Sequence, residues 1–120
     1  MRVEKLVKAA VAALEDIKAR DIVVLDVKRL TPMFDRIIIA SADSTRQSKA
    51  LARNLQEKLK AQGAAPHGVE GEQAGEWILV DLGAVVVHIM QPVVRQYYNL
   101  EELWAPPRVR QRRAVSRRAG

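Results

Sequence analysis

The stretch from Gly68 to Met90, GVEGEQAGEWILVDLGAVVVHIM, constrains the fold more than any other part of the chain. Two apolar runs in it, Glu76–Leu82 and Val85–Met90, flank the pair Gly83-Ala84. Glycine tolerates positive φ, so this pair suits a two-residue hairpin loop. We therefore predict a β-hairpin whose opposed residues are Leu82 with Val85, Val80 with Val87, and Ile78 with Ile89.

Side chains alternate across a strand, so this hairpin has two chemically different faces. The six opposed residues form a purely aliphatic face, which we interpret as core. The other face mixes large apolar groups with a carboxylate and an imidazole, which is unusual for a core and for a plain solvent face. We expect this second face to remain free for a partner. It carries Trp77, Leu79, Asp81, Val86, His88 and Met90.

The rest of the chain reads as an αββαβββα pattern, which predicts an α/β fold with a mixed sheet and helices mainly on one face. Apolar residues recur at helical spacing over 3–17, and residues 21–28 form a strand that we expect to be buried on both faces. A second strand covers 36–42. Ser44 and Gln47 have the spacing of a capping box at the start of a helix that ends near Gly63. We expect a short strand over 66–70. A short helix should begin at Gln91-Pro92 and carry Arg95, Tyr97 and Tyr98, and a second helical turn should cover 100–104.

Composition limits the class of protein. The chain has 120 residues, enough for one domain with a real core, and no cysteine, which fits a reducing cytoplasm. No apolar run approaches the roughly 20 residues of a membrane-spanning helix. Six of the 20 Lys and Arg residues are arginines of segment 105–120, which has no acid, so residues 1–104 hold 14 basic and 14 acidic side chains. We interpret 1–104 as the domain and 105–120 as a basic, disordered tail.

Catalytic and metal-binding patterns are weak. The chain has no cysteine to act as a nucleophile, and only His67 and His88 could act as an imidazole base. Asp81 shares the face of His88 but is not opposite to it in the predicted register. The scattered acids have no metal-ligand spacing. We predict no enzyme, no catalytic residue, no metal site and no cofactor.

A remnant nucleotide-binding enzyme of nucleotidyltransferase type is the alternative. The segment Ser41–Ser44 precedes a helix at about the right place, and a helix N-terminus can bind an anion. It lacks glycine, however, and no Asp-x-Asp pair follows in a strand. This alternative would use Ser44 and Asp81, whereas simple capping by Ser44 is the plainer interpretation.

The ordered set of motifs resembles the ribosomal silencing factors, the Iojap-like family. Each motif is weak alone, but together they run in order over residues 6–104. They are DIVVLDV at 21–27, STRQ at 44–47, GVEG at 68–71, EWILVDLG at 76–83, VVVH at 85–88, and Tyr98-x-Leu-Glu-x-Leu-Trp104.

This resemblance implies a nucleotidyltransferase-like fold without catalytic residues, and a homodimer in the free state. It implies binding to large-subunit ribosomal protein fourteen, which blocks association of the ribosomal subunits and represses translation under nutrient limitation. The family's contact positions match Trp77, Leu82 and Tyr98, with Asp81 and His88 nearby.

The chain departs from the family pattern at the hairpin tip and beyond it. Ala84 stands where the family usually has Asp, and Pro92-Val93-Val94 stand where it often has acids. With less negative charge there, we expect a more apolar contact. The arginine tail lies outside the resemblance and is a possible contact for ribosomal RNA, since arginine neutralises phosphate.

Overall fold

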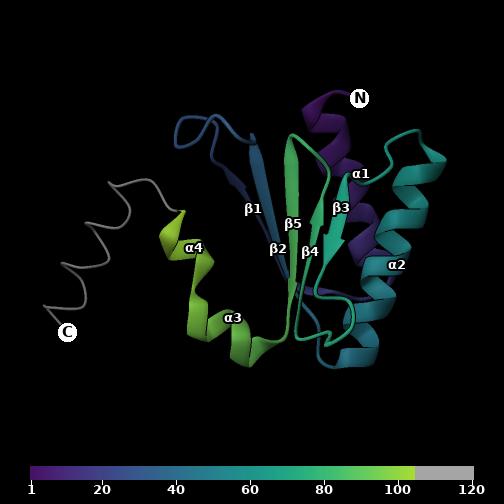
Figure 1. Cartoon of the computed structure of the whole chain (residues 1–120), viewed down its shortest axis with the longest axis vertical. Coiled ribbons are helices and arrows are strands. Elements are labelled where there is room, and N and C mark those ends of the chain that lie inside the picture. The colour runs from purple at the N-terminus through teal and green to yellow at the C-terminus, as the bar shows by residue number, and fades with distance from the viewer. Residues whose placement is uncertain (105–120) are drawn as a thin grey trace, which may run out of the picture.

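The structure is a computed structural model that describes residues 1–104, so the predicted disorder of 105–120 lies outside the described residues. None of the described helices is long and apolar enough to cross a membrane. A central sheet carries two long helices and two short ones (Figure 1). The elements are α1 (Val3–Asp16), β1 (Arg20–Asp26), β2 (Arg36–Ser41), α2 (Thr45–Ala61), β3 (Gly68–Glu70), β4 (Trp77–Asp81), β5 (Val85–Met90), α3 (Pro92–Tyr98) and α4 (Leu100–Leu103).

The five strands form one mixed sheet in the order β1-β2-β5-β4-β3. The central strands β2 and β5 are parallel, and the other neighbouring pairs are antiparallel. The predicted mixed α/β architecture is therefore confirmed. Because β2 and β5 lie in the middle, nearly all of their residues are buried.

The predicted hairpin register is confirmed. Ile78 is opposite Ile89 and Val80 is opposite Val87, and the backbone N–H of Leu82 donates to the carbonyl of Val85 at 2.9 Å. Gly83 has φ +91°, which an L-residue with a side chain rarely adopts.

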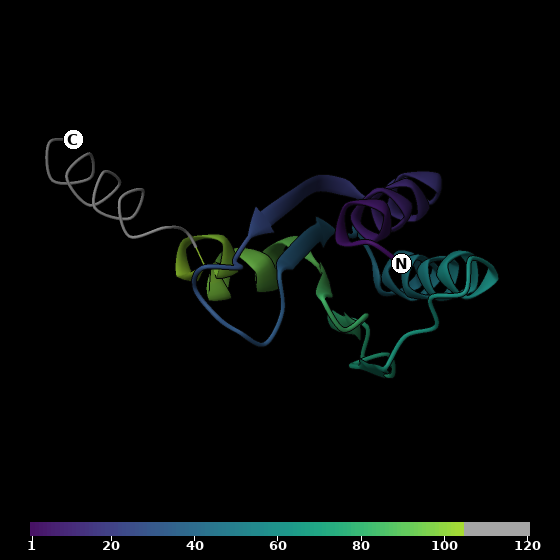
Figure 2. The same ribbon diagram turned by 90° about the horizontal axis from the view of Figure 1, so that it is seen from above.

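The aliphatic face of the hairpin packs against α1 and α2, as predicted. Both helices place an apolar stripe on the sheet, and Figure 2 shows them on the same side of it. The stripe of α2, Leu51, Leu55 and Leu59, is wholly buried.

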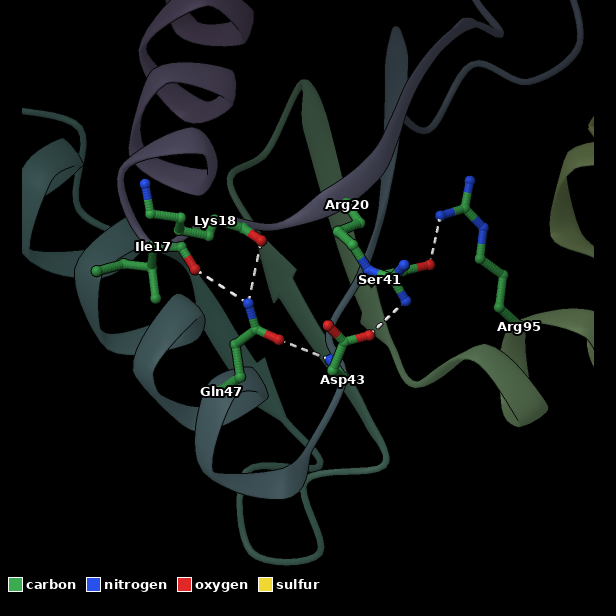
Figure 3. A network of polar contacts seen from close by, with 7 residues as sticks. All are labelled: Ile17, Lys18, Arg20, Ser41, Asp43, Gln47 and Arg95. Atoms are coloured by element: carbon green, nitrogen blue, oxygen red, sulfur yellow. Dashed lines mark hydrogen bonds and ion pairs between the residues drawn. The ribbon is translucent and has the colours of Figure 1, made fainter.

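The start of α2 differs in one detail from a capping box. The hydroxyl of Ser44 accepts from the backbone N–H of Gln47 at 3.0 Å, as expected. The side-chain oxygen of Gln47 accepts from the N–H of Asp43 and not from that of Ser44. Its amide nitrogen donates to the carbonyls of Ile17 and Lys18, both at 3.1 Å (Figure 3). Gln47 therefore ties the end of α1 to the start of α2.

The expectation that the first strand is buried on both faces is wrong. β1 is an edge strand with only β2 beside it, and Val24 is 41% exposed. A register shift between Arg20 and Val23 interrupts its pairing with β2. Ile22 packs against the hydrophobic core between the sheet and α1/α2, whereas Leu25 packs against the second core on the opposite side of the sheet. The apolar run of this edge strand therefore contributes to both cores without being buried on both faces.

The second face of the hairpin is less free than predicted. α3 and α4 lie on this side of the sheet, away from α1 and α2 (Figure 2). On β5 they leave Met90 fully buried, His88 8% exposed and Val86 7% exposed. On β4, the residues of this face are half-buried: Trp77, Leu79 and Asp81. Only the β4 half of the face is therefore accessible.

Candidate binding surface

Four rings form a continuous row on the second face, which we call the aromatic row: Tyr97, Tyr98, Trp77 and His88. Tyr97 and Tyr98 meet edge to face with ring centroids 5.0 Å apart. Tyr98 lies 4.8 Å from Trp77, and Trp77 lies 5.9 Å from His88. The row joins the end of α3 to β4 and β5.

The exposure of these rings falls steadily along the row. Tyr97 is 80% exposed and Tyr98 53% exposed, Trp77 is half-buried, and His88 is buried. Val93, one helical turn before Tyr97 on α3, is also 80% exposed. Adjacent exposed apolar side chains of this kind mark interaction sites more often than isolated ones do.

The inner end of the row is a hydrogen bond between two side chains. The indole Nε1–H of Trp77 donates to Nδ1 of His88 at 3.0 Å. Burial disfavours the charged imidazole and lowers the pKa of His88 from 6.5 to about 4. The imidazole is therefore neutral at neutral pH, with Nδ1 as acceptor and its proton on Nε2.

The position of Tyr98 depends on the turn between α3 and α4. Asn99 adopts a left-handed conformation with φ 47°, which ends α3 directly after Tyr98. The guanidinium of Arg95 then links three elements. It donates to both carboxylate oxygens of Glu101 at 3.0 and 3.1 Å, and to the hydroxyl of Ser41 at 2.8 Å (Figure 3 shows the Ser41 contact). α3 and α4 are thereby fastened to the end of β2.

The structure brings together three of the five predicted site residues, Trp77, His88 and Tyr98. Asp81 lies further along β4, where its carboxylate accepts from the N–H of Gly83 at 2.8 Å and supports the hairpin turn. Leu82 is 7% exposed and packs in the aliphatic core with α1 and α2, on the other face of the sheet.

Sequence reasoning missed Val93 and Tyr97 as part of this surface. Their i, i+4 spacing in a short helix without acids was the available signal. That signal is ambiguous, because the same spacing also describes a stripe that packs on a core.

The residues of the nucleotide-binding alternative do not form one site. Ser44 follows the end of β2 where Ser41 pairs with Met90, whereas Asp81 pairs with Val86 near the opposite end of β5. The polar groups near Ser44 already have partners. Asp43 forms an ion pair with Arg20 (Figure 3). The hydroxyl of Ser44 caps α2.

An open hollow of about 720 Å³ lies near that end of the sheet, between β1, the end of β2 and the α3/α4 segment. The guanidinium in its lining, that of Arg95, is held by Glu101 and Ser41. Across residues 1–104, no three His, Cys, Asp or Glu side chains gather closely enough to hold a metal ion.

Comparisons with known proteins agree on one family. The family model described as "Ribosomal silencing factor during starvation" matches residues 1–119. A ribosomal silencing factor of Chromobacterium violaceum is 53% identical over 104 residues, which are 87% of this chain and 85% of that protein. The chloroplastic protein Iojap of Zea mays is 39% identical over 95 residues, which are 77% of this chain and 40% of that protein. A crystal structure of a Chromobacterium violaceum protein matches with a TM-score of 0.86 and 51% identity, covering 89% of this chain and 91% of that chain. The chain belongs to the ribosomal silencing factor, or Iojap-like, family.

Proposed function

We propose that this protein binds the large ribosomal subunit through ribosomal protein fourteen and thereby prevents the small subunit from joining. The mechanism is occlusion, in which the domain occupies space that the small subunit needs. The cytoplasm is the corresponding location, and translation under nutrient limitation is the process that the protein would repress. It acts by binding, without catalysis or a cofactor.

The observation that carries this proposal is the aromatic row, whose Tyr97 and Tyr98 are exposed and whose Trp77 is half-buried, on a member of this family. Trp and Tyr bury a large area at low entropy cost and are favoured anchors of protein interfaces. A stable contact buries on the order of 1,600 Å² in total, which requires a surface wider than one side chain. Tyr97, Tyr98 and Trp77, together with Val93 on α3, supply a contiguous apolar surface of this kind.

The test of this proposal is Trp77→Ala in a sedimentation assay with separated ribosomal subunits. Loss of a central aromatic anchor should weaken large-subunit binding by about 2 kcal/mol or more, roughly 30-fold, and should restore subunit joining. Met33→Ala is the control, because Met33 is 78% exposed in the loop before Arg36, at the opposite end of the sheet from Trp77. Unchanged binding by a folded Trp77→Ala protein would count against the aromatic row as the docking surface.

The five predicted site residues have different parts in this proposal. Trp77 and Tyr98 make direct contact with the partner. Asp81 supports the hairpin turn beside the surface, and Leu82 supports it from the core side. His88 accepts the hydrogen bond of the Trp77 indole behind this surface.

Two further partners belong to the proposal. The free protein forms a homodimer, as members of the family are expected to do, and the 80% exposed side chains of Val93 and Tyr97 offer apolar area for such a contact. Light scattering that gives the mass of a single chain at micromolar concentration would contradict this. The arginine tail, residues 105–120, adds contacts to ribosomal RNA.

A further inference from the structure

His88 is the only buried titratable side chain in the described part of the chain. It lies in the middle of β5, directly opposite Leu79 and diagonally across from Trp77. A buried polar group needs a partner, and its partner here is the indole N–H of Trp77 at 3.0 Å. At 8% exposure, the imidazole presents little surface that a docking protein could touch.

We propose that His88 is a positioning residue, which fixes the Trp77 indole for docking and occupies its only hydrogen-bond donor. The inference rests on the proposed function, because it concerns how the same surface recognises its partner. It replaces direct partner contact by His88 with an effect that acts through Trp77.

The geometry supports a fixed indole. His88 sits on β5, a central strand that is buried along its whole length, so packed neighbours on both sides hold the acceptor in place. The Tyr98 ring, with its centroid 4.8 Å away, contacts the same indole from α3. The indole is thus held by a hydrogen bond from one element and a ring contact from another, before any partner arrives.

Two consequences for binding follow. A side chain that is already ordered loses little conformational freedom on docking, an effect of about two- to tenfold in affinity for one large side chain. Since the indole has a single N–H and His88 accepts from it, Trp77 offers the partner no donor. The matching pocket on the partner is therefore apolar around the indole and has no acceptor for it.

A double-mutant cycle separates this role from direct contact. His88→Leu removes the acceptor at similar volume, and Trp77→Phe removes the donor while keeping an aromatic ring. We expect His88→Leu to weaken large-subunit binding about fivefold in the wild-type background and by no measurable factor in the Trp77→Phe background. His88→Asn can place its amide oxygen near the position of Nδ1, so it should restore most of the affinity.

Nuclear magnetic resonance of the full chain gives a second readout that does not depend on ribosomes. The indole Nε1–H signal of Trp77, assigned by its loss in Trp77→Phe, should exchange slowly with water in the wild type and in His88→Asn. It should move and exchange faster in His88→Leu, whereas the Trp104 indole signal serves as an internal control. Thermal melting of each variant confirms that it is folded.

The outcomes are distinguishable. An equal loss of affinity from His88→Leu in both backgrounds would show direct contact by His88 and overturn the proposal. An indole signal that is unchanged in His88→Leu would overturn it as well, because the hydrogen bond would then not hold the ring. If the wild type itself fails to bind large subunits, the proposed function fails together with the affinity part, while the resonance measurement still decides whether His88 fixes the indole.

Discussion

At the scale of single residues, His88 has a consequence for stability that is separate from binding. The folded chain keeps the imidazole neutral down to a pKa of about 4, whereas an unperturbed histidine has a value of 6.5. Between these two values the unfolded chain takes up a proton that the folded chain does not. Protonation in the folded state would also break the hydrogen bond from Trp77.

The unfolding free energy should therefore fall as the pH is lowered from about 6.5 to about 4, and this contribution should be fully present above that range. The lowered pKa allows a loss of up to about 3 kcal/mol. Urea unfolding at a series of pH values measures it, with His88→Asn as the comparison, because that variant has no titrating group at this position. Equal pH dependence of the two proteins in this range would contradict the prediction.

Residue patterns predicted the register of the hairpin but not how much of it is covered. Alternation says which residues share a face, and the pairing of Ile78 with Ile89 followed from it. Whether Met90 and His88 on the second face are exposed depends on where the chain goes after Gln91. Nothing local in β5 encodes that path, so the sequence predicted a free face where the structure has a half-covered one.

At the scale of elements, the α3/α4 segment decides the shape of the candidate surface. α3 has no fully buried residue, and its apolar contacts with the sheet side are the partly buried Val94 and the ring of Tyr98 against Trp77. Its main polar link to the sheet is Arg95, whose side chain is 10% exposed and which bonds both Glu101 and Ser41. This contact spans 54 positions of sequence to Ser41, and for that reason no periodicity could reveal it.

Replacing this arginine with methionine should loosen α3 while leaving the two cores intact. Arg95→Met leaves Glu101 without its cation, and hydrogen bonds to charged groups contribute about 1.5–3 kcal/mol, so we expect the unfolding free energy to fall by about 2 kcal/mol. Urea denaturation measures the change. Gln96→Met is the matched control, since Gln96 is the exposed neighbour on the same helix. Faster amide exchange in α3 should accompany the loss, and two variants of equal stability would contradict the role of Arg95.

Features that depend on neighbouring residues were predicted more reliably than contacts between residues far apart in the sequence. The apolar run in β1 predicted a strand correctly but its burial wrongly, because four consecutive apolar residues fit an interior strand as well as an irregular edge strand. By contrast, the serine cap and the leucine stripe of α2 are local features, and both were predicted. The long-range bonds from Gln47 to the end of α1 were not.

At the scale of the whole molecule, charge and folded structure are separated along the chain. Residues 1–104 carry balanced charge, and the six excess arginines follow them. The aromatic row and the tail would therefore contribute to ribosome binding by different physical means. Apolar contacts depend weakly on salt, whereas contacts to phosphate release counterions and weaken steeply as salt rises.

Deleting residues 106–120 should flatten the salt dependence of large-subunit binding. Each lost phosphate contact should reduce the slope of log affinity against log salt by about 0.7 to 0.9. Binding measured over a salt series tests this, and a chain of full length with the six arginines changed to glutamine controls for the loss of length. Complete loss of binding at low salt would mean that the tail, and not the aromatic row, carries the interaction.

The parallel pairing of β2 with β5 also bears on when this chain can acquire its structure. The middle of the sheet joins residues 36–41 to residues 85–90, so its central seam requires most of the polypeptide. Pairings between distant segments form late and slowly, because the intervening chain must first be closed into a loop. A chain still under synthesis cannot form the pairing of β2 with β5 until Met90 has been synthesised and has left the ribosome. The ribosome that produces the protein thus meets it first as an incomplete chain, and the aromatic surface exists only after that encounter is nearly over.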